Sequence, residues 1–380
     1  MRGLVLVGGS SDCADMYYAS RFLKMDPFVY LETDEQRIVV VDPSEVARVR
    51  VLSGADEVWD QDEFVGLDDA MGTDVEALLP TIVLGAVGRA GLATAVVPDW
   101  FPTRVADLLR AHGVQVEVDP TVIRRRRRWK TPAEVEAIEA TLRVAEESMG
   151  LLRRTVREAA VDDEDVLRHA DGSVLTSERL QNEVRAFWAT RRCEGEVPII
   201  AGGGQAADGF ETGHGPLRAH TPITCDLFPR HTDTRYHADI TRVFCVGEPP
   251  TELVAVHESV RRALELARSL VRPGVRGSAV FEAVCEQYHA EGYGTPLHQG
   301  AAGGERAMGA PYLGHGLGLD VHELETGVEP YNGGQLHEGD VITLEPELYR
   351  LGWGAVRLED AVLVTADGSR TLTRFDYDLD

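Results

Sequence analysis

Four carboxylates stand inside stretches of sequence that otherwise have the composition of buried β-strands. Asp226 lies in PITCDLF, Asp239 in YHADITRVFCV, Glu345 in DVITLEPELY and Glu359 in GAVRLEDAVLV. Burying an ionised carboxylate is strongly unfavourable unless a cation or hydrogen-bond donors compensate its charge. The chain must therefore fold so that something positive reaches these four positions.

The period of a β-strand predicts how two of these carboxylates meet. Successive residues point to opposite faces, so Asp239 and Thr241 share one face and Arg242 lies on the other. A hairpin that turns near 230–235 can bring Asp226 across from Asp239, and two carboxylates on one buried face repel each other without a cation. Taken alone, Asp226 is also consistent with a turn cap, and Asp239 with a structural ion pair to Arg242.

An imidazole adds to this set. The segment GHGLGLDVHE (314–323) supplies His315 between two glycines and His322 seven residues later. Glycine lets the backbone and an ion approach closely. Four carboxylates and one imidazole suit Mn²⁺, Co²⁺, Fe²⁺ or Zn²⁺, and four negative charges balance two divalent ions. The predicted metal ligands are Asp226, Asp239, His315, Glu345 and Glu359.

Two kinds of pattern divide the chain. Short β-branched runs alternate with helical patterns in the first 120 residues, which indicates a small α/β domain. Strands are expected at 3–7, 28–32, 37–42, 94–98 and 114–118, and helices at 43–50, 74–91 and 102–113. The second half mixes helices (131–152, 177–192, 251–271, 278–292) with strands (196–202, 222–228, 236–246, 340–349, 354–364), which favours an α+β fold with a largely antiparallel sheet.

The run RRRRRW (124–129) marks the boundary between these halves. We predict a domain at 1–123, a linker at 124–130 and a second domain at 131–380. The arginines are interpreted as a solvated linker or as partners of the acidic surface. Thr131, Pro132 and Glu134 then form a capping box with a first-turn proline, which predicts a helix start.

The order Asp, Asp, His, Glu, Glu, each beside strand-forming residues, resembles the pita-bread metallopeptidases. That family includes methionine aminopeptidase, aminopeptidase P and prolidase. The likeness covers roughly residues 130–380 and lies in YHADITR (236–242), GHGLGLDVHE (314–323), TLEP (343–346) and VRLED (356–360). Arg235 stands where glycine is usual in the first of these motifs. The first domain resembles the creatinase/prolidase amino-terminal domain, which favours the Xaa-Pro peptidase branch.

The resemblance implies a role for each matching residue. Asp226 would bind one metal, Asp239 and Glu359 would bridge both, and His315 and Glu345 would complete the second. His322 would contact the substrate near the scissile carbonyl, Glu345 would shuttle a proton, and Arg357 would support the acidic cluster. Thr241 would hydrogen-bond near the bridging solvent. Expected catalytic residues are therefore His322, Glu345 and Arg357.

This sequence departs from the family pattern in two ways. The two aspartates are thirteen positions apart, a wider spacing than usual, which the longer turn FPRHTDTR (228–235) explains. Phe210 also stands where the family places a substrate-facing histidine. His214 is a candidate replacement if the loop shifts, and His220 is a less favoured one.

The resemblance implies a dinuclear-metal exopeptidase that hydrolyses the bond before proline through a metal-bridging hydroxide, as an aminopeptidase or a dipeptidase. The alternative is a homologue with weak or no peptidase activity, either a binding protein or a creatinase-like C–N hydrolase, because Phe210 replaces the usual histidine. The complete ligand set argues against the creatinase-like form.

Composition limits the partners and the location. The formal net charge is −25, which argues against nucleic acid and anionic membranes. The five cysteines are dispersed without CxxC spacing and the amino-terminal apolar run LVLV is short, so a cytoplasmic protein with reduced thiols is expected. Small peptides are the expected substrates, and a homodimer is implied by the resemblance.

Overall fold

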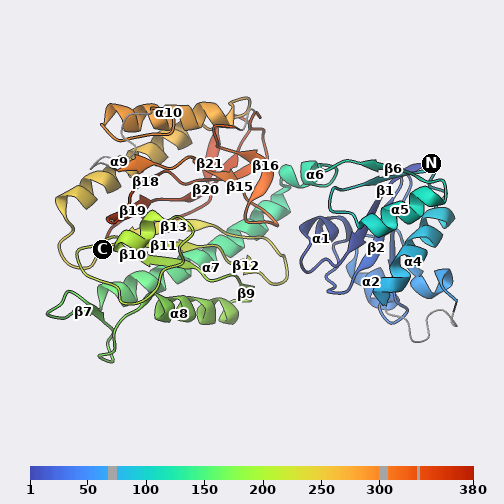
Figure 1. Cartoon of the computed structure of the whole chain (residues 1–380), viewed down its shortest axis with the longest axis horizontal. Helices are drawn as coiled ribbons and strands as arrows, with labels where there is room; N and C mark the ends of the chain where they lie inside the picture. The colour runs from blue at the N-terminus through green and yellow to red at the C-terminus, as the bar shows by residue number, and fades with distance from the viewer. Residues whose placement is uncertain (67–74, 299–306, 332–333) are drawn as a thin grey trace. The chain divides into compact units, whose positions relative to one another are not determined.

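The computed structural model describes residues 1–66, 75–298, 307–331 and 334–380. The chain forms two compact units, Met1–Arg127 and Arg128–Asp380. Both units combine helices and strands (Figure 1), which confirms the predicted α+β class. Within the described residues, no helix has the length and apolarity needed to cross a membrane.

The first unit is built on a six-stranded sheet in the order β4-β3-β2-β1-β5-β6. Leu4 and Leu6 of β1 enter one apolar core, and Val5 and Val7 enter the core on the opposite face. Because both faces are covered, these strands read as near-continuous apolar runs. The elements are β1 (Arg2–Gly8), α1 (Ala14–Ser20), β2 (Phe28–Glu32), β3 (Arg37–Val41), α2 (Val46–Leu52), β4 (Glu57–Asp60), α4 (Val75–Arg89), β5 (Thr94–Val97), α5 (Thr103–Ala111) and β6 (Gln115–Val118).

Most of these elements follow the predicted pattern, but two were missed. Helix α1 and strand β4 had no prediction, and α2 begins three residues later than expected. Residue 74, where the helix of α4 was expected to start, lies outside the described residues.

The arginine run forms a short helix, α6 (Arg124–Arg128). Every arginine of α6 pairs with a carboxylate, so pairing with acidic groups is the interpretation that the structure supports. The pairs are Arg124–Asp99, Arg125–Asp119, Arg126–Glu32, Arg127–Asp15 and Arg128–Asp340.

Four long helices frame the second unit: α7 (Pro132–Arg157), α8 (Ser177–Thr190), α9 (Thr251–Leu270) and α10 (Gly277–Ala290). The start of α7 has the predicted capping box between Thr131 and Glu134. In Figure 1, α9 and α10 lie on one side of the strands of this unit, and α7 and α8 lie on the other.

The strands between these helices form several small antiparallel sheets. Three of them carry the site: β10-β11-β13, β14-β18-β19 and β16-β15-β17-β20-β21. Their bounds are β10 (Ile199–Gly202), β11 (Ile223–Leu227), β13 (Ile240–Phe244), β14 (Met308–Gly309), β15 (His315–Gly316), β16 (Glu323–Gly327), β17 (Val341–Leu344), β18 (Glu347–Arg350), β19 (Gly354–Arg357), β20 (Asp360–Val364) and β21 (Ser369–Thr371). Shorter pairs are β7 (Ala160–Val161) with β8 (Leu167–Arg168) and β9 (Cys193–Glu194) with β12 (Arg230–His231).

The two C-terminal strands expected at 340–349 and 354–364 are each broken in two. The chain leaves the five-stranded sheet after Leu344, joins the three-stranded sheet at Glu347, and returns after Arg357. Glu345 and Glu359 therefore lie between strands and not inside them. Pro346 cannot donate a ladder hydrogen bond, which favours the first break.

The hairpin register also differs from the expectation. Asp226 pairs with Thr241 and not with Asp239, which directly precedes β13. Asp239 is thus two residues further along the same face, because side chains of alternate residues share a face.

Arg242 ties the site strands to the C-terminal tail. Its side chain, 1% exposed, donates to Asp360 Oδ1 at 2.8 Å and to the carbonyls of Thr241, Glu359, Phe375 and Asp376. The alternative ion pair between Asp239 and Arg242 is wrong, because the guanidinium binds on the opposite face of β13.

We expect Arg242→Met to lower the free energy of unfolding by about 3–5 kcal/mol, because it leaves the fully buried Asp360 without its main cation. Arg261→Met, which removes an exposed pair with Glu265 on α9, should cost less than about 1 kcal/mol. Urea denaturation of both variants measures the difference. Equal losses would contradict a stabilising role for the buried contacts.

Candidate metal centre

A cavity of about 930 Å³ opens in the second unit and contains most of the predicted site residues. Three sheets supply its walls, because β11 and β13, the β17–β18 crossing and the β19–β20 crossing converge there. The predicted residues that line it are Phe210, Asp226, Asp239, His315, His322, Glu345, Arg357 and Glu359.

His315 lies at the centre of the acidic cluster. Its Nε2 is 3.4 Å from Glu345 Oε1, 3.5 Å from Asp239 Oδ2 and 4.0 Å from Glu359 Oε1. Its Nδ1 is 3.1 Å from the carbonyl of Gly316, which can only accept a hydrogen bond. This contact leaves Nε2 as the nitrogen with a free lone pair, facing three carboxylates.

The donor atoms fit a divalent cation. Asp239, His315 and Glu359 each offer one ligand atom within 4.8 Å of the others. Three carboxylate oxygens in the cluster are buried without a hydrogen-bond partner among the described residues: Oδ1 of Asp226, Oδ1 of Asp239 and Oε1 of Glu359. Buried unpaired oxygens are costly, and an oxygen and nitrogen donor set is what Mn²⁺, Co²⁺ and Zn²⁺ bind.

The same crowding shifts the pKa values of the cluster. Burial, with repulsion from Asp226 and opposed by Arg357, raises the pKa of Glu345 to about 8. Burial and the neighbouring carboxylates raise the pKa values of Asp239 and Glu359 well above their usual range. Burial, then His322, lowers the pKa of His315 to about 3. Without a cation the cluster favours protonated carboxyls and a neutral imidazole.

Arg357 supplies the positive charge that this cluster has from the protein. Its Nη2 donates to Asp226 Oδ2 at 2.6 Å, and its Nη1 is 3.5 Å from Glu347 Oε2. Glu347 is a further buried carboxylate that the sequence analysis did not select, although it stands two residues after Glu345. One guanidinium cannot balance five buried carboxylates, so a deficit of positive charge remains.

His322 and Thr241 both lie next to the acidic cluster. The rings of His315 and His322 meet edge to face with centroids 4.1 Å apart. His322 is more exposed and faces the cavity, so it is open to a substrate. Thr241 Oγ1 donates to Glu359 Oε2 at 2.8 Å, which orients that carboxylate.

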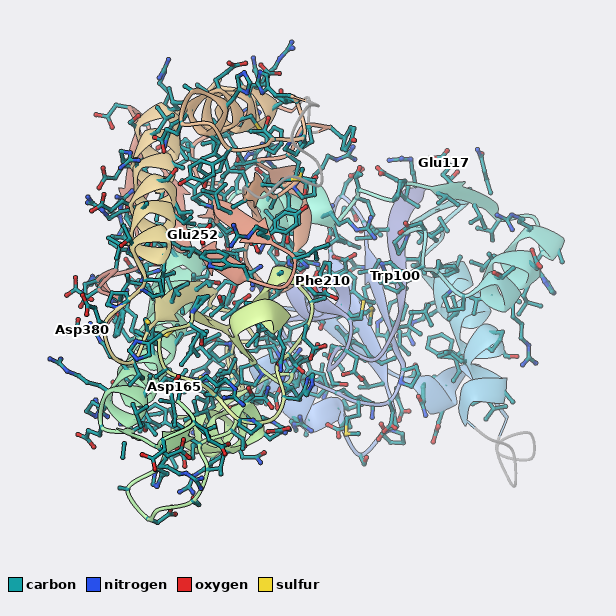
Figure 2. The ribbon with its side chains drawn as sticks, turned by 60° about the vertical axis from the view of Figure 1, so that its left-hand side comes forward. Trp100, Glu117, Asp165, Phe210, Glu252 and Asp380 are labelled. Atoms are coloured by element: carbon teal, nitrogen blue, oxygen red, sulfur yellow. The ribbon has the colours of Figure 1, made fainter. Side chains whose placement is uncertain are left out.

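The three candidates for the substrate-facing position lie in different places. Phe210, labelled in Figure 2, lines the cavity and is 82% exposed. His214 and His220 are exposed and do not line the cavity: Nδ1 of His214 is 3.5 Å from Glu211, and Nδ1 of His220 is 2.9 Å from the carbonyl of Glu248. The structure therefore brings Phe210, and neither histidine, to the site.

Sequence reasoning missed other residues of the cavity wall, among them Arg230, His237 and Tyr312. Burial, then the charge of Arg230, lowers the pKa of His237 to about 4. The signal for His237 was available, because it precedes Asp239 by two positions in YHADITR and shares its face in an extended chain.

Comparisons of sequence agree with this site. A family model described as metallopeptidase family M24 matches residues 130–366. A Xaa-Pro dipeptidase from Pyrococcus horikoshii is 35% identical over 145 residues, which are 38% of this chain and 37% of that relative's length. A probable dipeptidase, PepE, from Mycobacterium tuberculosis is 29% identical over 307 residues, or 78% of this chain and 72% of the relative.

Solved structures share the fold along the whole chain. An X-Pro aminopeptidase from Thermotoga maritima has a TM-score of 0.80 at 22% identity, covering 100% of this chain and 97% of that one. A prolidase from Pyrococcus horikoshii has a TM-score of 0.76 at 22% identity, covering 100% and 96%. The predicted pita-bread fold is thereby confirmed.

The family match spans more than half of the sequence and includes every residue of the acidic cluster. The family implies divalent metal ions, which the unpaired oxygens of the cluster fit. The chain belongs to metallopeptidase family M24.

Proposed function

We propose that this chain is an exopeptidase that uses two divalent ions, Mn²⁺, Co²⁺ or Zn²⁺, to hydrolyse the peptide bond before proline. The observation that carries the proposal is the set of buried, unpaired carboxylate oxygens around His315 Nε2. The names of the matched relatives, a Xaa-Pro dipeptidase and a prolidase, support the choice of substrate.

In this proposal Asp226, Asp239, His315, Glu345 and Glu359 would hold the ions. When bound, such ions polarise the substrate carbonyl and lower the pKa of a water molecule toward neutrality. Thr241 orients the carboxylate of Glu359 through the hydrogen bond at 2.8 Å. The first residue of the peptide then lies with its free amine toward the acidic cluster.

The remaining groups act on the substrate. His322 donates to the oxygen on which negative charge develops, a contact worth a few kcal/mol in comparable sites. Glu345 takes a proton from the attacking water and delivers it to the leaving nitrogen. Arg357 holds Asp226 in place at 2.6 Å and limits the repulsion inside the cluster. The proline nitrogen in the scissile bond carries no hydrogen, so the site needs no acceptor for a backbone N–H at that residue.

The proposal also takes the partners and location from the sequence. Small peptides and a second copy of the chain are its partners, without nucleic acid or membrane, and the cytoplasm is its location.

A second function is favoured by Phe210. This residue lines the cavity in place of a histidine, and neither His214 nor His220 reaches the wall. A homologue with weak or no peptidase activity, acting as a binding protein or a C–N hydrolase, would explain that exchange.

Assays with and without Mn²⁺ on Ala-Pro and on Xaa-Pro-Xaa peptides separate these functions. Release of proline from Ala-Pro identifies a dipeptidase, and release of the first residue from the longer peptides identifies an aminopeptidase. Hydrolysis that does not need metal would favour the C–N hydrolase, and no hydrolysis would favour the binding protein.

In the same assay we expect Phe210→His to raise kcat/KM by about tenfold or more, because a well-placed imidazole adds proton transfer or a hydrogen bond. Phe210→Ala is the matched control for the loss of the ring and should not gain activity. If Phe210→His leaves kcat/KM unchanged, the phenylalanine does not limit the reaction.

Metal content tests the proposed centre without turnover. Protein purified without chelator should retain about two equivalents of divalent metal by elemental analysis, and Asp239→Asn or Glu359→Gln should retain less than about one. Glu196→Gln removes an exposed carboxylate of the same cavity and should retain the wild-type amount. Less than one equivalent in the wild type, unrestored by Mn²⁺ or Co²⁺, would count against the centre.

The stability of the chelated protein should fall as pH rises. The pKa of Glu345 is about 8 in the fold against its ordinary 4.5, so the unfolded chain binds fewer protons between these values and folding is progressively disfavoured. We expect the Tm of the chelated protein to drop more steeply across this range than that of Glu345→Gln. The exposed control Glu282→Gln should follow the wild type, and a steeper fall in Glu345→Gln would refute the assignment.

A further inference from the structure

A row of alternate residues leads along the cavity wall away from the metal centre. Asp226, Phe228 and Arg230 line the cavity, whereas Leu227 and Pro229 between them do not. The chain is therefore extended over this segment, and Arg230 shares a face with Asp226. Four residues of extended chain place the two α-carbons about 13 Å apart.

Arg230 is the accessible cation of the cavity. Among the described residues that line it, Arg230 and Arg357 are the two arginines, and there is no lysine. Arg357 is 5% exposed and is enclosed by Asp226 and Glu347, whereas the side chain of Arg230 is 27% exposed. Other lining carboxylates, including Glu196, Asp320 and Glu329, repel an anion elsewhere in the cavity.

The guanidinium of Arg230 has more N–H donors than its hydrogen bond to Glu194 uses. Its Nη2 donates to Glu194 Oε1 at 2.8 Å, and Arg235 Nη1 donates to that same oxygen at 2.8 Å. Glu194 is thus shared between two guanidinium groups, and its side chain is 48% exposed. An arginine carries five N–H donors in a planar fork that can bind a second carboxylate through two parallel hydrogen bonds.

We propose that Arg230 binds the free C-terminal carboxylate of the substrate, so that the enzyme selects short peptides with an unmodified carboxyl end. The inference rests on the proposed function, since the scissile bond must lie at the metal centre. An extended peptide spans at most about 3.3–3.6 Å per residue. The Arg230 side chain spans part of the roughly 13 Å between the α-carbons of Asp226 and Arg230. The distance that remains fits a bound peptide of two or three residues.

The test compares free peptides with their C-terminal amides. The full-length chain loaded with Mn²⁺ is assayed on Ala-Pro, Ala-Pro-Ala and the amide of each. Wild type should show a KM for at least one free acid that is roughly 10- to 100-fold below that of its amide, as expected for a charge-assisted hydrogen bond. Arg230→Gln should abolish that preference by raising KM for the acid while kcat and the amide kinetics stay close to wild type.

Two further variants control for folding and charge. Arg192→Gln removes an exposed arginine that pairs with Asp233 and does not line the cavity, so it should keep the full preference. Arg230→Lys keeps the positive charge but loses the planar fork of donors, so it should keep part of the preference for the free acid. Equal KM values for acids and amides in the wild type, or a preference that survives Arg230→Gln, would overturn the role of Arg230.

Failure of the proposed function is distinguishable from failure of this inference. If the metal-loaded wild type hydrolyses none of the peptides, the proposed function fails, and isothermal titration calorimetry of the same peptides then reads their binding directly. Tighter binding of an acid than of its amide, lost in Arg230→Gln, would still support the carboxylate site. Equal binding of acid and amide would refute it.

Discussion

The repulsion among buried carboxylates is the constraint on which the second unit depends. Asp226, Asp239, Glu345 and Glu359 converge on one cavity wall, and Arg357 pairs with Asp226 there. Burial, together with this repulsion, raises the pKa values of Asp239, Glu345 and Glu359 in the protein alone. A fold that tolerates such a conflict gains a strong preference for small, doubly charged cations.

The route of the chain explains how these carboxylates meet without disrupting a sheet. Strands β17 and β20 pair in one sheet, and β18 and β19 pair in another, so the chain crosses between sheets twice at the same level. Glu345 and Glu359 lie at these two crossings, where the backbone has left one ladder and not yet joined the next. Their amides bond instead to the carbonyls of Leu313 and Thr241. A residue at such a crossing can aim its side chain at a centre that no continuous strand would reach.

This geometry shows which parts could be predicted from the sequence. Apolar runs with helical or alternating period identified most elements, and the chemistry of buried charge identified the five candidate ligands. The crossings were missed because TLEPELY and VRLEDAVLV read as single strands, and their breaks depend on which sheets are available to pair. Arg230 was missed because it follows Pro229 in an apparent turn. Only the extended path beyond that proline aligns it with Asp226.

The second unit also separates the acidic cluster from a buried structural ion pair at the point where residues 241–242 approach residues 359–360. Thr241 and Glu359 meet on the cavity side, while their neighbours Arg242 and Asp360 form a buried ion pair on the opposite side. Because adjacent residues point to opposite faces, the backbone hydrogen bond from Glu359 to Thr241 places both contacts at once. Arg242 donates to the carbonyl of Glu359 and also to the carbonyl of Phe375 in the C-terminal tail. The backbone of Glu359 is therefore anchored on the side away from the cavity, and this anchoring positions its carboxylate. The acidic cluster can therefore stay crowded, since the force that opposes its repulsion acts through backbone anchored outside the cavity.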